Sequence, residues 1–178
     1  DIEFTMGPAE EGVTGLQFVD NTKNGVIPRE YIPAIEKGFK GALTNGVLAG
    51  FPMENLKVTL TDGSFHPVDS DALSFESCAS IAFKAAGQKA GAVLMEPIMK
   101  VEVHCPDDYL GDVTGDLNKK RSILREVTAD MGFQVVKADV PLAEMFGYIT
   151  TLRSLSSGRA NFTMELGYYA PVPEAIAD

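Results

Sequence analysis

The second half of the chain alternates between strand and helix patterns in an order that few folds accommodate. Six elements follow one another from Pro97, and their periodicities place strands at 98–103, 122–128, 133–140 and 161–168 and helices at 107–120 and after 140. The order is therefore β-α-β-β-α-β. This order predicts a ferredoxin-like fold, in which two helices pack on one face of an antiparallel sheet.

The segment from Val140 to Ala160 shows a clear helical pattern. Apolar residues at helical spacing predict one buried face, made by Leu142, Met145, Phe146, Ile149 and Leu152. The opposite face carries polar residues, namely Thr150, Thr151, Arg153 and Ser154. A glycine-containing turn follows before the last strand. We therefore predict an amphipathic helix that packs on the sheet.

The first half of the chain predicts a smaller mixed module. Its strands are expected at 1–5, at 16–19 and within 53–65, with a turn or bulge at Asp62-Gly63, and its helices from Pro28 to Gly46 and over 70–86. Ser70 or Asp71 is expected to cap the second helix. Its inner side is expected to carry Phe75, Cys78, Ala79, Ala82 and Ala86. We place the boundary near Glu96, which gives domains over 1–95 and 96–178.

Composition limits the classes of protein to which the chain can belong. Hydrophobic residues make up 45% and charged residues 22%, as in soluble globular proteins, and no apolar run approaches the roughly 20 residues that span a bilayer. The two cysteines do not make a disulfide framework, so we expect a cytoplasmic protein without a membrane segment. A formal charge of −10 argues against broad nucleic-acid binding. Any RNA contact should therefore be confined to a small patch.

Residue patterns for catalysis and metal binding are weak. A hydrolytic triad of His66, Asp69 and Cys78 is disfavoured because Cys78 lies within a helical pattern rather than at a nucleophile turn. The His104-Cys105 pair lacks a second pair of ligands at the spacing that zinc sites use. Asp107 and Asp108 suit the start of a helix. We therefore expect no catalytic residue and no metal site in this chain.

Two polar segments remain, and each has an ordinary structural explanation. The loop DGSFHPVDSD at 62–71 is a turn-rich connection in which Asp69 or Ser70 caps the following helix. The basic cluster of Lys119, Lys120, Arg121 and Arg125 suits a solvated helix C-terminus. Sequence physics alone leaves both explanations open beside a binding function.

Blocks of sequence throughout the chain resemble the C-terminal part of elongation factor G, a family of translational GTPases. They are GVIPREYIPAIEKGF at 25–39, GFP at 50–52 with LKVTLTDGSFHPVDSD at 56–71, LMEPIMKVEV at 94–103, YLGDVTGDLNKKR at 109–121, and PLAEMFGY with LRS and a Gly-Arg turn after 140. The resemblance implies the equivalent of domains IV and V. The implied fold class is α+β, with an N-terminally truncated ribosomal-protein-S5-like βαβ domain followed by a ferredoxin-like domain.

The resemblance also implies a function on the ribosome without bond-breaking chemistry in this chain. A tip loop would enter the decoding site beside transfer RNA and message, through Ser64, Phe65, His66, Pro67, Val68, Asp69 and Ser70. A basic surface would face ribosomal RNA and protein near the stalk base, through Lys119, Lys120, Arg121, Arg153, Ser157 and Arg159, with Ser156 beside them. GTP and Mg would bind in an N-terminal domain of the parent protein, which we expect to be a monomeric GTPase that promotes translocation.

Three alternatives to a translocation factor follow from the same residues. The family includes paralogues that act in ribosome recycling or lack GTPase activity, and this chain does not separate them. An acylphosphatase-like enzyme on the ferredoxin-like fold needs a phosphate-cradling loop with Arg and Asn after its first strand. Residues 104–108, HCPDD, are acidic there and repel phosphate. A regulatory module for a small ligand would need a Gly-rich loop at a sheet edge.

Overall fold

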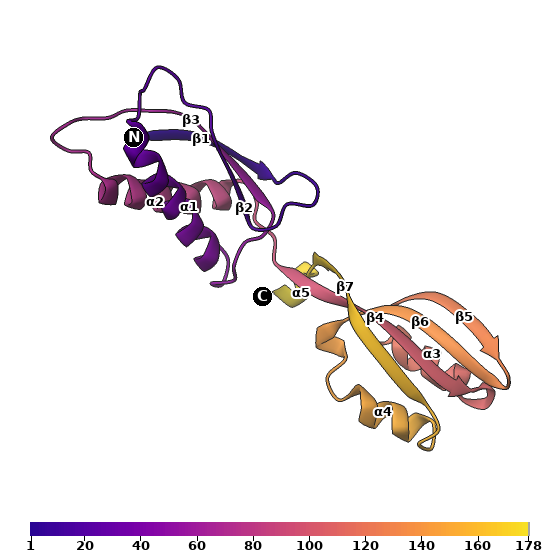
Figure 1. Ribbon diagram of the computed structural model, residues 1–178. Helices are drawn as coiled ribbons and strands as arrows, with labels where there is room; N and C mark the ends of the chain where they lie inside the picture. Colours follow the sequence, from indigo (N-terminus) through magenta and orange to yellow (C-terminus); the bar gives the residue numbers. More distant parts are fainter. Residues whose placement is uncertain (178) are drawn as a thin grey trace. The chain divides into compact units, whose positions relative to one another are not determined.

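A computed structural model describes residues 1–177 and divides the chain into two compact units, residues 1–93 and residues from 94 onward. Both units contain helices packed on sheets, so the predicted α+β class is confirmed (Figure 1). The sequence predicts a domain boundary between residues 95 and 96, two residues after the end of the first unit and one residue into the first strand of the second unit, β4 (Met95–Pro106).

The first unit has a three-stranded sheet and two long helices. In chain order these are β1 (Ile2–Pro8), β2 (Leu16–Asp20), the 3-10 turn η1 (Arg29–Tyr31), α1 (Ile32–Asn45), β3 (Leu56–Gly63) and α2 (Ala72–Lys89). The strand order is β1-β3-β2, with β3 antiparallel to β1 and parallel to β2. The segment β2-α1-β3 is therefore a βαβ crossover, as the ribosomal-protein-S5-like prediction requires. A bulge interrupts the pairing of β1 with β3 next to Asp62.

The helices of the first unit begin and end where the sequence signals lie. Gly46 ends α1 at a φ of 65°, and its N–H donates to the Ala42 carbonyl oxygen. Asp71 caps α2, because its carboxylate accepts a 2.6 Å hydrogen bond from the Ser74 N–H. The buried side of α2 differs from the prediction: it carries Phe75, Ala79, Phe83 and Gly87, whereas Cys78, Ala82 and Ala86 are half-buried. These four buried residues are each four positions apart, so they form one row along α2, and this row packs on α1.

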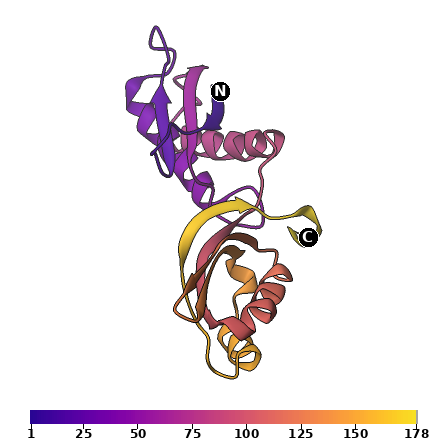
Figure 2. The same cartoon turned by 90° about the vertical axis from the view of Figure 1, so that its right-hand side faces the viewer.

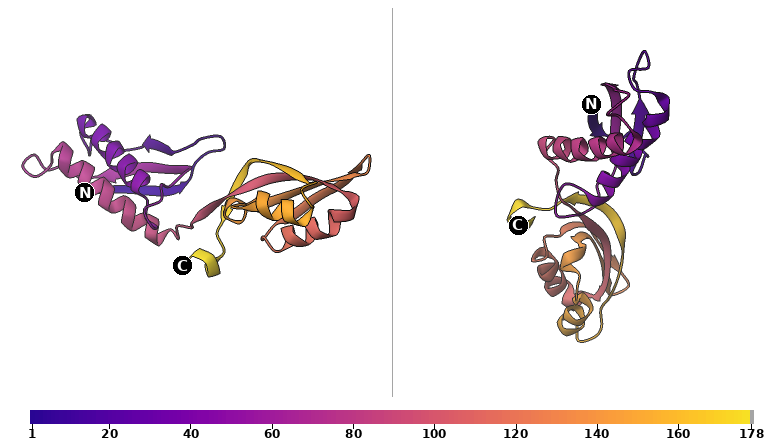
Figure 3. Two further views of the ribbon diagram at one scale, coloured as in Figure 1. Left: turned by 90° about the horizontal axis from the view of Figure 1, so that it is seen from below. Right: turned by 90° about the vertical axis from the view of Figure 1, so that its left-hand side faces the viewer.

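The second unit has the predicted ferredoxin-like order. After β4 come the 3-10 turn η2 (Asp107–Tyr109), α3 (Leu110–Asn118), β5 (Ile123–Asp130), β6 (Phe133–Pro141), the 3-10 turn η3 (Leu142–Glu144), α4 (Tyr148–Leu155), β7 (Asn161–Pro171) and the short α5 (Glu174–Ala177). The strand order is β5-β6-β4-β7, with every neighbouring pair antiparallel. Figures 2 and 3 show α3 and α4 on one side of this sheet.

The hydrophobic core of each unit lies between its sheet and its helices. In the first unit, Phe39 contacts the rings of Phe4, Phe18 and Phe83. In the second unit, the fully buried residues are Val103, Cys105, Val113, Leu117, Val136, Val140 and Leu152. Burial of one such side chain contributes about 1.5–3 kcal/mol to folding. The edge strands β5 and β7 leave most of their side chains exposed.

The helix predicted after Val140 is shorter than expected and starts later. Gly147 adopts a left-handed φ of 74°, which separates η3 from α4. Met145, before Gly147, still faces the core together with Tyr148 and Leu152, whereas Phe146 is 80% exposed instead of buried. Ile149 is also exposed. Between residues 142 and 155 the buried residues are Met145, Tyr148 and Leu152, so the predicted face was wrong at Phe146 and Ile149.

Candidate functional site

The topology of the first unit gathers two loops at one end of its sheet. Since β2 and β3 are parallel, the loop after β2 and the loop after β3 leave the sheet on the same side. Because β1 is antiparallel to β3, Asp1 also lies there, and its carbonyl oxygen accepts a 3.0 Å hydrogen bond from the Ser64 N–H. We call residues 64–70 the tip loop.

The tip loop is closed by hydrogen bonds between its own residues. The His66 carbonyl oxygen accepts from the N–H groups of Asp69 at 3.1 Å and Ser70 at 2.9 Å. In return, the Ser70 hydroxyl oxygen accepts from the His66 N–H at 3.0 Å. The Ser70 side chain therefore serves to close the loop. A loop with fixed shape can present its outer residues at little conformational cost on binding.

Phe65 anchors the base of the tip loop in an aromatic stack. Its ring lies 5.4 Å from the ring of Tyr31 in η1, and Tyr31 in turn lies 5.2 Å from Phe75 in the first turn of α2. Both interplanar angles are near 30°, which is an offset stack. The loop is therefore held by η1 on one side and by α2 on the other.

The seven expected tip residues fall into two groups. Ser64, Phe65 and Ser70 are half-buried and hold the loop in place. His66, Pro67, Val68 and Asp69 are exposed, and Val68 is 93% exposed at the apex. An apolar side chain with that exposure has no partner within this unit. His66 has an exposed ring that is free to stack on or hydrogen-bond to a ligand.

Carboxylates dominate the electrostatics of this end of the unit. Six acidic residues lie on or beside the two loops, together with two cations, Lys23 and Arg29; the acids are Asp1, Asp20, Glu30, Asp62, Asp69 and Asp71. Hydrogen bonds from Ser74 lower the pKa of Asp71 below its ordinary value, so this carboxylate is firmly ionised at neutral pH. An anionic ligand must therefore approach through the few neutral and basic groups.

Basic residues expected on the second unit lie at two ends of its helix pair. At one end, the Lys120 ammonium lies 5.6 Å from the centre of the Tyr148 ring, at the start of α4. At the other end, the Tyr109 hydroxyl donates a 3.4 Å hydrogen bond to Ser157, beyond the end of α4. Lys119 and Lys120 are therefore grouped apart from Arg153, Ser157 and Arg159, and the fold does not bring the six residues into one patch.

Arg121 belongs to an ion-pair cluster of the second unit. Its guanidinium donates to both carboxylate oxygens of Glu96, at 2.7 and 3.2 Å, and to Glu144 at 3.1 Å. Its side chain is 25% exposed, and the hydrogen bonds to Glu96 raise the pKa of Arg121 further above its ordinary value. Arg121 thus joins β4, the end of α3 and η3. Arg125 is similarly held by Asp139, which also accepts from the Tyr168 hydroxyl.

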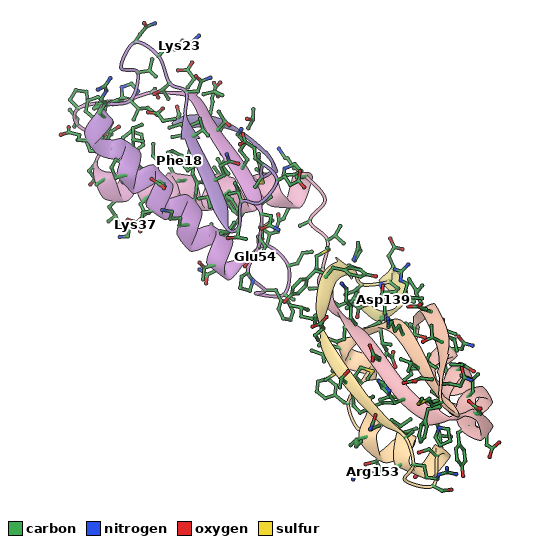
Figure 4. All side chains as sticks on the ribbon, turned by 45° about the vertical axis from the view of Figure 1, so that its right-hand side comes forward. Phe18, Lys23, Lys37, Glu54, Asp139 and Arg153 are labelled. Carbon is green, nitrogen blue, oxygen red and sulfur yellow. The ribbon has the colours of Figure 1, made fainter. Side chains whose placement is uncertain are left out.

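The turn after α4 presents the remaining basic residues. Arg153 projects outward from α4 (Figure 4), and Arg159 and Ser157 are also exposed. Ser156 was expected beside them as a phosphate contact, but it is fully buried. Its hydroxyl donates to the Leu152 carbonyl oxygen and accepts from the Ala160 N–H. Ser156 therefore fixes the turn and cannot reach a ligand.

The residues considered for catalysis lie apart or are engaged in the fold. His66 is on the exposed tip loop, whereas Cys78 is half-buried in α2. Burial raises the pKa of the Cys105 thiol, with a smaller effect from Asp107, so this thiol is a poor nucleophile. Asp107 accepts a hydrogen bond from the Gln134 side chain. Across residues 1–177 we find no group of three metal-ligating side chains, and no helix long and apolar enough to cross a membrane.

The second unit also has a shallow hollow of about 570 Å³ on the sheet face opposite its helices. Charged side chains of alternating sign line it, including Lys100, Glu102, Arg125, Lys137 and Asp139. Lys137 pairs with Glu126 on the neighbouring strand at 3.2 Å. Such pairing is typical of a solvated sheet face.

The geometry defines a class of α+β protein with two units. The first unit presents an exposed loop at one end of its sheet, and the second unit is ferredoxin-like. Each of the two units matches a family model. The family model described as "Elongation factor G, domain IV" matches residues 1–91, and the model described as "Elongation factor G C-terminus" matches residues 93–178. The chain therefore belongs to the elongation factor G family, as its sequence blocks predicted.

Individual relatives agree with this assignment. The chain is 57% identical to an elongation factor G of Amoebophilus asiaticus and 53% identical to one of Cytophaga hutchinsonii, in each case over all of this chain and 25% of the relative. A crystal structure of a protein from Thermus thermophilus superimposes with a TM-score of 0.85 at 39% identity, over 99% of this chain and 26% of that one. The chain thus spans about a quarter of the length of the curated relatives it matches.

Sequence patterns did not single out residues 20–25, which lie between the expected strand at 16–19 and the expected helix from Pro28. In the structure, Lys23 lies at the same end of the unit as the tip loop. The signal that would have found it is the parallel pairing of β2 with β3. Sequence periodicity does not report which strands pair.

Proposed function

We propose that this chain is the ribosome-binding part of a translation factor that promotes movement of transfer RNA and message, with the tip loop entering the decoding site. Family membership supports a function in translation elongation. The observation that carries the finer proposal is the exposed, internally closed tip loop, which presents His66, Pro67, Val68 and Asp69 on a rigid base. A protruding loop of fixed shape is suited to occupying a vacated site by steric and polar contact.

The second unit anchors the factor near the base of the ribosomal stalk. Local contacts to phosphate come from the exposed Lys119, Arg153, Ser157 and Arg159 and from the half-buried Lys120. Arg121 supports them by joining β4, α3 and η3. The parent protein carries GTP and Mg in a separate domain and acts as a monomeric, cytoplasmic GTPase. This chain positions the factor on the ribosome and occupies the vacated decoding site, and it neither binds nor hydrolyses GTP by itself.

The test of the proposal is His66→Ala in the full-length parent. We expect slower translocation in a single-round assay with ribosome-stimulated GTP hydrolysis nearly unchanged, because His66 lies on an exposed loop and its ring holds no part of the fold. Lys84→Ala on the exposed side of α2 is the matched control and should match the parent in both assays. An equal loss of both activities would contradict the tip function.

A further inference from the structure

We propose that residues 21–28 form a second loop of the RNA-facing surface, with Lys23 as its phosphate-contacting cation and Tyr31 as the residue that positions it against the tip loop. This inference rests on the proposed function of the tip loop. The partner is the sugar-phosphate backbone of RNA. We call residues 21–28 the lysine loop.

The lysine loop and the tip loop share one end of the sheet. Strand β2 pairs with β3 in parallel from Leu16↔Leu56 to Asp20↔Leu60, so both strands point toward the same end. The Asn21 N–H extends this pairing by donating to the Leu60 carbonyl oxygen at 2.8 Å. In Figure 4, Lys23 lies at this end of the unit, and Glu54, which precedes β3, lies at the other.

Local hydrogen bonds give the lysine loop a defined shape. The Asp20 carboxylate accepts from both the N–H and the hydroxyl of Thr22, at 3.0 and 2.7 Å. The Val26 N–H donates to the Lys23 carbonyl oxygen, and the two residues between them, Asn24 and Gly25, have φ values of 57° and 66°. Positive φ at both central positions is the geometry of a type I′ turn. Lys23 therefore begins a tight turn and is exposed.

Two contacts connect the lysine loop to the tip loop. Ile27 is 1% exposed and packs against Gly63, the residue before the tip loop, where an added Cβ would lie 2.6 Å from the Ile27 Cδ1 atom. Tyr31, three residues past the lysine loop, stacks on Phe65 at the base of the tip loop. The two loops are therefore fixed relative to each other and can present one continuous surface.

The charge of this surface identifies what Lys23 can contribute. Six side-chain carboxylates on or beside the loops repel an RNA backbone, and Lys23 makes no ion pair with any residue in the described part of the chain. An exposed, unpaired ammonium on a rigid turn is suited to contact a phosphate, which otherwise has few favourable groups at this end. The contact is local, as the overall charge of −10 requires.

The experiment compares Lys23→Ala with Lys84→Ala in the full-length parent, since Lys84 is also exposed and without an ion pair among residues 1–177 but lies on α2. We expect Lys23→Ala to slow translocation several-fold and to reduce the slope of log ribosome affinity against log salt by about 1, as for loss of one phosphate contact. Lys84→Ala should leave both unchanged. Unchanged thermal unfolding of each variant shows that the fold is intact.

Tyr31 is tested as a positioning residue by a pair of substitutions. Tyr31→Ala should slow translocation and lower the salt slope part of the way toward that of Lys23→Ala, because the lysine loop is no longer held against the tip loop, and Tyr31→Phe should restore both by restoring the stack on Phe65. A Tyr31→Phe variant as slow as Tyr31→Ala would overturn this function for Tyr31.

The outcomes separate this inference from the proposed function. If His66→Ala slows translocation while Lys23→Ala behaves like Lys84→Ala, the lysine loop is not part of the surface and the inference fails alone. A slower Lys23→Ala variant with an unchanged salt slope would assign Lys23 to a protein contact and would also overturn it. If neither His66→Ala nor Lys23→Ala changes the rate, the tip function fails together with the inference.

Discussion

The tip loop of the first unit and the basic residues of the second unit were selected from the same sequence, but the fold treats them differently. The tip residues are consecutive, and they form one exposed loop between β3 and α2 that is closed by its own hydrogen bonds. The basic residues are dispersed, and the fold separates them to two ends of α3 and α4 and engages Arg121 with Glu96 and Glu144. Contiguity in sequence therefore predicts a shared site better than shared charge does.

The largest expected effect is on stability, at Arg121. Replacing it with alanine leaves Glu96, whose side chain is only 13% exposed, without its two hydrogen bonds and also frees Glu144. We expect the free energy of unfolding to fall by about 2 kcal/mol, less than for a fully buried pair because Arg121 is partly exposed. Urea titration of the parent and the variant measures this difference in the free energy of unfolding.

Lys119→Ala, at an exposed position close to Arg121 in the sequence, is the matched control and should leave the unfolding free energy within about 0.5 kcal/mol of the parent. Equal stability of the Arg121 and Lys119 variants would show that the ion pairs of Arg121 do not stabilise the second unit. It would also remove the main difference between the two candidate surfaces.

A smaller effect is expected at Asp71, next to the tip loop. Asp71→Ala removes the acceptor for the Ser74 N–H at the start of α2 and should lower the urea midpoint of the first unit. Since the folded pKa of Asp71 lies below its unfolded value, its contribution is present above the unfolded pKa of about 3.9 and is lost as pH falls through the folded pKa. The difference between parent and variant should therefore shrink in acid.

The Asp71 prediction is checked by urea titrations at neutral and acid pH. Asp69→Ala, at an exposed position of the tip loop whose side chain makes no hydrogen bond among residues 1–177, serves as the control and should keep the parental midpoint. A midpoint difference at Asp71 that stays constant into acid would show that its charge and hydrogen bond do not stabilise α2.

The smallest effect near neutral pH is expected at Tyr148, in the core of the second unit. Its hydroxyl is buried with no hydrogen-bond partner among residues 1–177, and desolvation, with a smaller effect from Asp116, raises the pKa of Tyr148 well above its ordinary value of about 10. Tyr148→Phe should therefore change stability at pH 7 by no more than about 1 kcal/mol, since it removes an unpaired polar group.

Tyr148 should become important in alkali. Because its folded pKa is raised, its contribution is fully present below the unfolded pKa of about 10 and is lost as pH rises toward the folded pKa. The parent should lose stability above a pH of about 10 more steeply than Tyr148→Phe. Tyr169→Phe, at an exposed position on β7, should keep the parental pH profile. Identical alkaline profiles for the parent and Tyr148→Phe would contradict the assignment.

Sequence patterns predicted the fold class and most elements because each element depends on local periodicity and caps. The strand order of the second unit followed from the β-α-β-β-α-β sequence of elements, and Gly46 and Asp71 marked helix ends. The pattern failed at Phe146 and Ile149, because two neighbouring apolar stripes fit the helical spacing and the core buries the one made by Met145, Tyr148 and Leu152. Periodicity alone does not decide which of the two stripes faces the sheet.

The sequence by itself determined the family, the order of the elements and the position of the tip loop, because these depend on consecutive residues. Only the tertiary structure decided that Lys23 lies at the same end of the sheet as the tip loop, that Arg121 is held by Glu96 and Glu144, and that Ser156 is buried. These three facts depend on strand pairing and on contacts between residues distant in sequence. No pattern within one segment contains that information, since the free energy that fixes it comes from packing between segments.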